Sequence, residues 1–281
     1  MMWVSDTAPP ESPIPPRAWP RLVMRGIAVI LLLLVGLGAH GLLRLIERPL
    51  VGLSRPASGR LVQAVCQGAL WLIGLRMRVA GRPMPGQGAM VANHGSWLDI
   101  LVLNAAIPVH FVSKHEVAGW PGIGLLARAT GTVFIQRDRR HAQAQTRLFE
   151  ARLRAGQRLL FFPEGTSSDG QRVLPFKSTL FAAFFAPELR ERLQIQPVSL
   201  RYHAPRARDP RFYGWWGDMA LGGHLARVLA ERPQGQVELV FHTPVRVADM
   251  PGRKEIARHC EAAVRAGFAG SATMAVGDAE R

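Results

Sequence analysis

The stretch 88-GAMVANHGSWLDI-100 joins a run of small and apolar residues to a histidine and an aspartate that lie five positions apart. The apolar run predicts a buried strand, and the pattern from about 96 to 106 predicts a helix. Ser96 is a good candidate for the N-cap of that helix, with His94 in the turn before it and Asp99 in its first turns. The aspartate could then hold one imidazole nitrogen and leave the other free as a general base. A purely structural His–Asp pair is the competing interpretation.

Outward from this stretch, short β-branched or apolar runs alternate with helical patterns. This alternation predicts an α/β fold with a mostly parallel central sheet flanked by helices. Strands are expected near 87–92, 109–113, 131–136, 158–162, 194–201 and 236–247, and helices near 96–106, 122–129, 141–156 and 177–186. Polar stretches follow three of these strands, namely NHGSWLD, QRDRR and PEGTSSDG. Chemistry in open α/β sheets gathers where strands end, so these stretches are the candidate site.

The charge of the chain favours an anionic partner. Thirty-five Lys and Arg stand against 20 Asp and Glu, a formal charge of +15, while 48% of the residues are hydrophobic. Such an excess suits nucleic acid or an anionic membrane surface. Because the chain also carries long apolar segments, we expect a membrane bilayer as a partner and no nucleic acid.

The main apolar segment is GIAVILLLLVGLGAHGLL, residues 26–43, which carries no charge and is long enough for one membrane-spanning helix. A cleaved signal peptide is the alternative. Arginines flank both ends, so the charges set no orientation. A second run, residues 61–75, is too short to span comfortably. It fits an interfacial helix, the return leg of a shallow hairpin or an ordinary buried helix.

Four parts are predicted along the chain. Residues 1–22, with six prolines between positions 9 and 20, form a disordered arm. Residues 23–80 form membrane-anchoring helices, 81–268 the main domain, and 269–281 a flexible tail. The two cysteines, Cys66 and Cys260, match no metal or redox spacing and are expected to be core thiols.

Two further polar segments could bind a ligand. The backbone amides of 162-FPEGTSSDG-170 could cradle an anion, and Glu164 could accept a hydrogen bond from a substrate hydroxyl; an ordinary polar turn is the alternative. Arg137 ends the segment 133-VFIQRDRR-140, and Lys114 follows the preceding strand. Together these cations could hold a phosphate, or they could belong to a solvated face.

In this order, NHGSWLDI, GTVFIQRDRR, FFPEGTSS and 194-QIQPVSL-200 resemble the four sequence blocks of the glycerolipid acyltransferase family, over about positions 85 to 205. The resemblance implies that His94 is the base that deprotonates the acceptor hydroxyl and that Asp99 orients it. It also implies that the acceptor attacks an acyl thioester directly, since no serine elbow is present.

The resemblance also implies a set of substrate-binding residues. Arg137 is expected to bind the acceptor headgroup, and Glu164 with Gly165 to shape the acceptor site. Lys114, Thr166 and Ser167 complete the expected set.

One position departs from the family pattern, which commonly reads FPEGTR where this chain has Ser167. An arginine can bind a phosphate through two parallel hydrogen bonds. Without it, phosphate binding weakens by about 1.5–3 kcal/mol unless another cation replaces it. Lys114, Arg137, Arg172 and Lys177 are the candidates for that replacement. The first expected acceptor is 1-acyl-sn-glycerol-3-phosphate, which gives phosphatidic acid. Lyso-ornithine lipid is the alternative, which EGTSSDG and 214-GWWGDM-219 favour by their resemblance to that branch.

The resemblance further implies acyl-CoA or acyl carrier protein as donor, no metal or bound cofactor, and a place in the inner membrane with the catalytic domain facing the cytoplasm. Two alternatives stay open: a thioesterase or lipid hydrolase, and a lipid-binding relative without catalysis. The aromatic run 212–217 fits an interfacial wedge or buried packing. Phe181, Phe184 and Phe185 fit an acyl-chain groove or the core.

Overall fold

The computed structural model describes residues 3–7, 9, 13–86, 88–120, 122–135 and 142–274. A central sheet contains β1 (Arg76–Ala80), β2 (Gly88–Ala92), β3 (His110–Lys114), β4 (Val133–Ile135), β5 (Arg158–Phe161), β6 (Gln194–His203), β7 (Gln236–Phe241) and β8 (Val245–Arg246). The helices are α1 (Trp19–Val51), α2 (Pro56–Ile73), α3 (Leu98–Ala106), α4 (Ile123–Thr130), α5 (Ala142–Arg154), α6 (Pro187–Arg190), α7 (Leu221–Ala230) and α8 (Arg253–Met274). Short 3-10 helices cover Pro16–Ala18, His115–Gly119 and Ser178–Phe185.

The strands lie in the order β1-β7-β6-β2-β5-β3-β4, with β8 paired to β6. Strand β2 pairs in parallel with both β5 and β6, and β3 pairs in parallel with β4 and β5. Only the β6–β7 and β6–β8 pairs among those described are antiparallel. The predicted α/β fold with a mostly parallel sheet is therefore confirmed.

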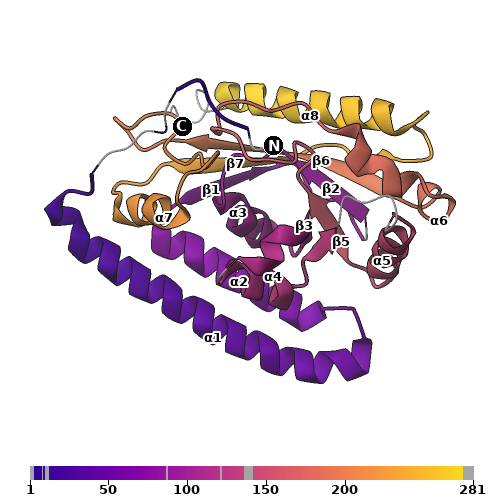
Figure 1. Ribbon diagram of the computed structural model, residues 1–281, viewed down its shortest axis with the longest axis horizontal. Coiled ribbons are helices and arrows are strands. Elements are labelled where there is room, and N and C mark those ends of the chain that lie inside the picture. Colours follow the sequence, from indigo (N-terminus) through magenta and orange to yellow (C-terminus); the bar gives the residue numbers. More distant parts are fainter. Residues whose placement is uncertain are drawn as a thin grey trace.

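Helices cover both faces of the sheet (Figure 1). Met90 and Ala92 of β2 belong to one core cluster with side chains of α2 and α3. Ala89 and Val91 belong to a second cluster, with side chains of α5, α8 and the 3-10 helix Ser178–Phe185. Because side chains alternate along a strand and both faces are covered, every residue of β2 is buried.

Helix α1 lies at the edge of the molecule as one long rod (Figure 1). Its 33 residues extend about 50 Å at 1.5 Å per residue. By length and composition, it is the one described helix able to cross a membrane. Its exposed apolar side chains include Val23, Ile27, Ile30, Leu31, Leu34, Val35, Leu42, Leu45 and Ile46.

Helix α2 carries the second apolar run and packs between α1 and α3. Its Cys66, Leu70 and Ile73 are buried in the core. One face of α2 therefore belongs to the core, whereas Trp71 on the same helix is 79% exposed.

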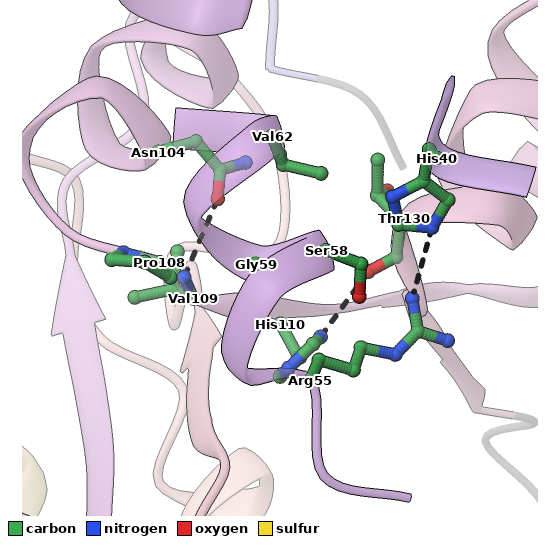
Figure 2. Close-up of a pocket in the computed structure, with 10 residues that line it drawn as sticks. All are labelled: His40, Arg55, Ser58, Gly59, Val62, Asn104, Pro108, Val109, His110 and Thr130. Atoms are coloured by element: carbon green, nitrogen blue, oxygen red, sulfur yellow. Dashed lines mark hydrogen bonds between the residues drawn. The ribbon is translucent and has the colours of Figure 1, made fainter. Parts of the chain in front are cut away.

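Polar contacts join α1 and α2 to the neighbourhood of β3 (Figure 2). Arg55 NH1 and His40 Nε2 both lie 2.8 Å from the carbonyl oxygen of Ala129, at the end of α4. Glu47 of α1 accepts hydrogen bonds from the backbone N–H groups of Ala57 and Ser58 and so caps α2. A cavity of about 10 Å³ remains between these groups, room for one water molecule.

Several predicted boundaries differ from the structure. Helix α1 begins at Trp19, inside the predicted arm, because Pro20 occupies its first turn, where a missing N–H costs nothing. Strand β1 was included in the anchoring segment, but it pairs in parallel with β7. Helix α8 continues to Met274, past the predicted start of the tail at 269.

The region around 177–186 also differs, since Ser178–Phe185 forms a 3-10 helix. Phe181 and Phe184 are fully buried and pack on Phe161, so core packing sets this conformation. Phe181 and Phe184 therefore belong to the core and do not line an acyl-chain groove. Helices α7 and α8 were missing from the predicted elements.

Candidate active site

The candidate residues gather at one edge of the sheet. His94 follows β2, the loop that contains Glu164 follows β5, and Lys114 is the last residue of β3. These three strands are parallel neighbours in the order β2-β5-β3, so their carboxyl ends meet at one edge. Arg137, which was predicted to bind the headgroup, lies outside the described residues.

The His94–Asp99 pair is formed. His94 Nδ1 lies 2.7 Å from Asp99 Oδ2, and the Asp99 side chain is completely buried. The same Oδ2 accepts hydrogen bonds from the backbone N–H groups of Gly95 (2.9 Å) and Ser96 (3.1 Å). The hydroxyl of Tyr202, on β6, donates to Oδ1 at 2.7 Å. Four donors therefore satisfy a carboxylate that no water reaches.

The helix begins later than predicted. Helix α3 starts at Leu98, and its N-cap Trp97 makes no side-chain cap. Ser96 Oγ accepts only a 3.3 Å bond from the Leu98 N–H. The Asp99 carboxylate itself binds the N–H groups of the turn before the helix, so the predicted Ser96 cap is replaced by the aspartate.

Two contacts hold the His94 ring in one orientation. The imidazole stacks on the ring of Phe162, with centroids 4.0 Å apart and planes 11° apart. Its side chain is 20% exposed, and within the described part of the chain its Nε2 has no hydrogen-bond partner. Phe162 holds one face of the ring and Asp99 holds Nδ1, while Nε2 stays open. This arrangement suits a general base.

The loops after β2, β5 and β6 meet at His94, and their backbones lie close together. The His94 carbonyl accepts the N–H of Ser168, and the Gly95 carbonyl accepts the N–H of Trp215, both at 2.9 Å. A Cβ on Gly95 would lie 2.9 Å from the Cα of Gly170, and a Cβ on Gly214 would collide with the Asp169 carbonyl oxygen. Glycine is therefore required where the loops after β2, β5 and β6 touch.

Glu164 is 1% exposed. Its Oε1 accepts the backbone N–H of Leu174 at 3.2 Å, whereas Oε2 has no partner among the described residues. Burial raises the pKa of Glu164 well above its usual value, although the N–H groups of Leu174 and His94 oppose that change. This carboxyl therefore pins the loop through Oε1, while its buried Oε2 has no partner among the described residues.

The acceptor loop is the loop after β5, residues 162–176. Its residues 165–167 are less buried than Glu164. Gly165 adopts a left-handed conformation with φ of 71°, which turns the chain after Glu164. Thr166 Oγ1 accepts the backbone N–H of Trp3 at 3.2 Å, and Ser167 is half-buried. They precede Ser168, whose backbone N–H binds the His94 carbonyl, and Lys114 lies at the end of the neighbouring strand β3.

Arg172 was a candidate replacement for the missing family arginine. Its Nε and NH2 both bind the carboxylate of Asp169, at 3.2 and 2.9 Å, and Asp169 is buried. The guanidinium is therefore already paired with a carboxylate. Lys177 is exposed just before the 3-10 helix Ser178–Phe185.

Sequence reasoning missed Tyr202, Phe162 and Trp3. Tyr202 and Phe162 lie on or next to strands that were expected, but no motif marks them as partners of His94 or Asp99. The aromatic run 212–217 is largely buried: Tyr213 and Trp216 are inaccessible, and Tyr213 donates to Gln234. For these two rings the structure supports buried packing.

Replacing Tyr202 by Phe removes the only donor to Asp99 Oδ1 among the described residues. We expect the free energy of unfolding to fall by about 1–3 kcal/mol, because a buried acceptor loses its partner. The NMR resonances of the His94 ring should also move. Tyr213→Phe is the control, since it removes another buried hydroxyl but leaves those resonances in place. Unchanged stability and unchanged His94 resonances in Tyr202→Phe would contradict the assigned contact.

Glu164→Gln tests the raised pKa. Between pH 4.5 and the raised pKa, the folded protein keeps a proton that the unfolded chain releases. The stability of the parent should therefore fall as pH rises through this window, by up to about 1.4 kcal/mol per pH unit. Glu164→Gln should lose that slope, measured by denaturation at several pH values, while Glu255→Gln on α8, whose side chain is 37% exposed, should retain it. Equal slopes in all three proteins would show that Glu164 ionises normally.

Comparison with known proteins agrees with this geometry. The family model described as Acyltransferase matches residues 76–201. A lyso-ornithine lipid O-acyltransferase of Rhodobacter capsulatus is 55% identical over 267 residues, which cover 95% of this chain and 97% of the relative. A 1-acyl-sn-glycerol-3-phosphate acyltransferase of Neisseria gonorrhoeae is 33% identical over 77% of this chain and 84% of its own length.

The crystal structure of the 1-acyl-sn-glycerophosphate acyltransferase of Thermotoga maritima has a similar fold. The TM-score is 0.62 at 20% identity, over 91% of this chain and 98% of that one. The fold, the matched family model and the full-length relative agree. The chain therefore belongs to the glycerolipid acyltransferase family and is an acyltransferase of lysolipids.

Proposed function

We propose that His94 is the general base of the transfer and that Asp99 orients it. His94 Nε2 takes the proton of the lysolipid hydroxyl while that oxygen attacks the thioester carbonyl carbon. The new C–O ester bond forms as the C–S bond breaks, and the proton returns from the imidazolium to the leaving thiolate. The observation that carries this proposal is the 2.7 Å bond from Nδ1 to Asp99, with Nε2 left open.

A direct transfer is favoured because no hydroxyl or thiol among the described residues is hydrogen-bonded to His94 Nε2. Ser168 is buried, and its hydroxyl lies within hydrogen-bond distance of the carbonyl oxygens of His94 and Arg172. Both cysteines are buried in the core, and burial raises the pKa of each thiol to about 12. An acyl-enzyme intermediate would need an exposed, activated nucleophile next to His94.

For the acceptor, we propose lyso-ornithine lipid ahead of 1-acyl-sn-glycerol-3-phosphate, which reverses the order expected from sequence. Ser167 stands where the family commonly has arginine, and Arg172 is engaged by Asp169. A phosphate monoester would thus lack two of its expected cations, whereas an ornithine headgroup carries an ammonium and a carboxylate. The full-length relative from Rhodobacter capsulatus, named for lyso-ornithine lipid, supports this order.

Lysophosphatidic acid is the second candidate. Lys114 ends β3 beside the site, and Lys177 is exposed close to the acceptor loop. Lys177 would face a phosphate more readily than Arg172, which Asp169 already binds. The Neisseria gonorrhoeae relative, named for that acceptor, supports this candidate.

Helix α1 and the family together indicate that the protein associates with membranes. We further propose that α1 and α2 anchor the protein to the inner membrane, with the catalytic domain on the cytoplasmic side. Acyl-CoA and acyl carrier protein are found there, and the +15 charge attracts either anionic donor.

The test is acyl transfer by the detergent-purified protein, with each labelled donor offered to both acceptors. We expect labelled ornithine lipid to exceed labelled phosphatidic acid. His94→Ala should lower transfer by about 10²–10⁴-fold, the usual contribution of a general base. His115→Ala, at an exposed histidine, is the matched control and should retain activity.

Three results would count against parts of the proposal. Phosphatidic acid as the main product would restore the acceptor order expected from sequence. Free fatty acid released without acceptor would indicate a thioesterase. Undiminished transfer by His94→Ala would refute the catalytic role.

A further inference from the structure

A second and much larger cavity, of about 380 Å³, lies where the start of α1 meets the end of α7 and the loop after β6. Figure 1 shows α1 beginning beside α7, and the two helices are in contact. The volume is within the usual range of ligand-binding sites. The residues of the candidate active site do not line this cavity, so it has no role in the reaction described above.

Arginine side chains dominate the polar lining of this cavity. They come from the segment before α1, from α1, from α7 and from the two loops beside it: Arg17, Arg21, Arg208, Arg227 and Arg232. Two carboxylates, Asp209 and Glu231, stand against these five arginines, which leaves an excess of three positive charges. Because like charges around one concave volume repel each other, the lining favours an anion inside it.

Both carboxylates of the lining are already bound by arginines. Asp209 accepts two hydrogen bonds from Arg211, which lies outside the lining, at 3.0 Å from Nε and 2.8 Å from NH2. Glu231 Oε2 lies 2.7 Å from Arg208 NH2. The carboxylates therefore do not neutralise the other arginines of the cavity.

Arg17 and Arg232 remain available to a ligand. Both side chains are exposed, and neither forms an ion pair within the part of the chain that the structure describes. Arg17 stands just before α1, and Arg232 follows the end of α7, so the two approach the cavity from different elements. A pair of guanidinium groups on two sides of a cavity suits the oxygens of a phosphate group.

The walls of the cavity are fixed to each other. Arg21 Nε donates to the carbonyl oxygen of Ala230 at 2.8 Å. Arg25 NH1 donates to the carbonyl oxygens of Leu229 and Glu231, at 3.0 and 2.8 Å. Carbonyl groups at the end of a helix lack partners within it and attract cations. These contacts fasten the start of α1 to the end of α7, so the cavity does not depend on a ligand for its shape.

The apolar surface of α1 begins next to this cavity. Trp19, Val23 and Met24 are exposed, and Arg17 and Arg21 flank the tryptophan. Tryptophan and arginine at the end of an apolar helix favour the headgroup region of a bilayer. The phosphate layer of a membrane that surrounds α1 is therefore expected at the level of the cavity.

We propose that this cavity binds the phosphate headgroup of an anionic phospholipid from the surrounding membrane. Arg17 and Arg232 bind the phosphate, and Ile14 and Phe212 give the cavity an apolar wall. The phosphates of CoA have similar chemistry, so the test must separate the two sources. The inference needs a membrane around α1, but it does not depend on the acceptor or on the role of His94.

The experiment is calorimetric titration of the full-length protein in a non-ionic detergent. The probes are short-chain phosphatidylglycerol, short-chain phosphatidylcholine and CoA. The parent should bind phosphatidylglycerol more tightly than phosphatidylcholine, whose headgroup has no net charge. Arg17→Gln combined with Arg232→Gln should raise the Kd for phosphatidylglycerol about 10- to 30-fold, roughly fivefold for each arginine lost near an anionic lipid. The Kd for CoA should change little.

Two further pairs of substitutions are controls. Arg192→Gln with Arg253→Gln removes the same charge from exposed positions outside the cavity and should leave the Kd for phosphatidylglycerol near that of the parent. Arg17→Lys with Arg232→Lys keeps the charge and should retain most of the binding. Thermal unfolding of each variant shows that a change in affinity is not a loss of fold.

Three results would overturn the inference. The first is equal affinity of the parent for the two lipids, and the second is the same rise in Kd for both glutamine pairs. The third is a loss of CoA affinity as large as the loss of lipid affinity, which would make the cavity a site for donor phosphates. Because binding is measured without acyl transfer, failure of the proposed reaction would leave this test intact.

Discussion

The candidate active site depends on the buried carboxylate of Asp99 and its four hydrogen-bond donors. Transferring a carboxylate out of water is costly, so each of its oxygens must be matched by a donor. Two of the donors are backbone N–H groups of the turn after β2, one is the hydroxyl of Tyr202 on β6, and one is His94 Nδ1. The same contacts therefore start α3, connect two parallel strands and orient the His94 ring.

The loops around this carboxylate follow from the same constraint. With the turn after β2 held tightly against α3, its carbonyl oxygens face outward and accept N–H groups from the two other loops of the site. Those loops can approach only because glycines stand at the contact points. The candidate site is thus a junction of three loops at the carboxyl edge of the sheet.

The charges of the loop after β5 bear directly on the acceptor that we propose. A phosphate monoester needs cations that are not already neutralised, and Arg172 is paired with Asp169. The protein carries a large positive charge overall, but the described acceptor loop contains no unpaired arginine. Net charge therefore predicts attraction to membranes and donors, and it does not identify the headgroup that the site accepts.

Much of this architecture could be predicted from sequence. Strand β2 is apolar throughout, and the polar stretches after β2 and β5 stand where a parallel sheet places its chemistry. Contacts between distant residues could not be predicted, because nothing local in the sequence marks them. In the sequence, Tyr202 resembles any other residue of a buried strand. Trp3 belongs to a proline-rich arm whose composition predicts disorder. Strand β1 was assigned to the anchor because its pairing with β7 depends on residues far along the chain.

The most direct test of the account is a double-mutant cycle on kcat, with His94→Ala, Asp99→Asn and the pair of substitutions. If Asp99 acts only by orienting and stabilising the His94 ring, Asp99→Asn should lower kcat strongly in the parent and hardly at all once His94 is Ala. Full additivity of the two losses, in proteins shown to be folded, would mean that the two residues act independently and would contradict the central claim.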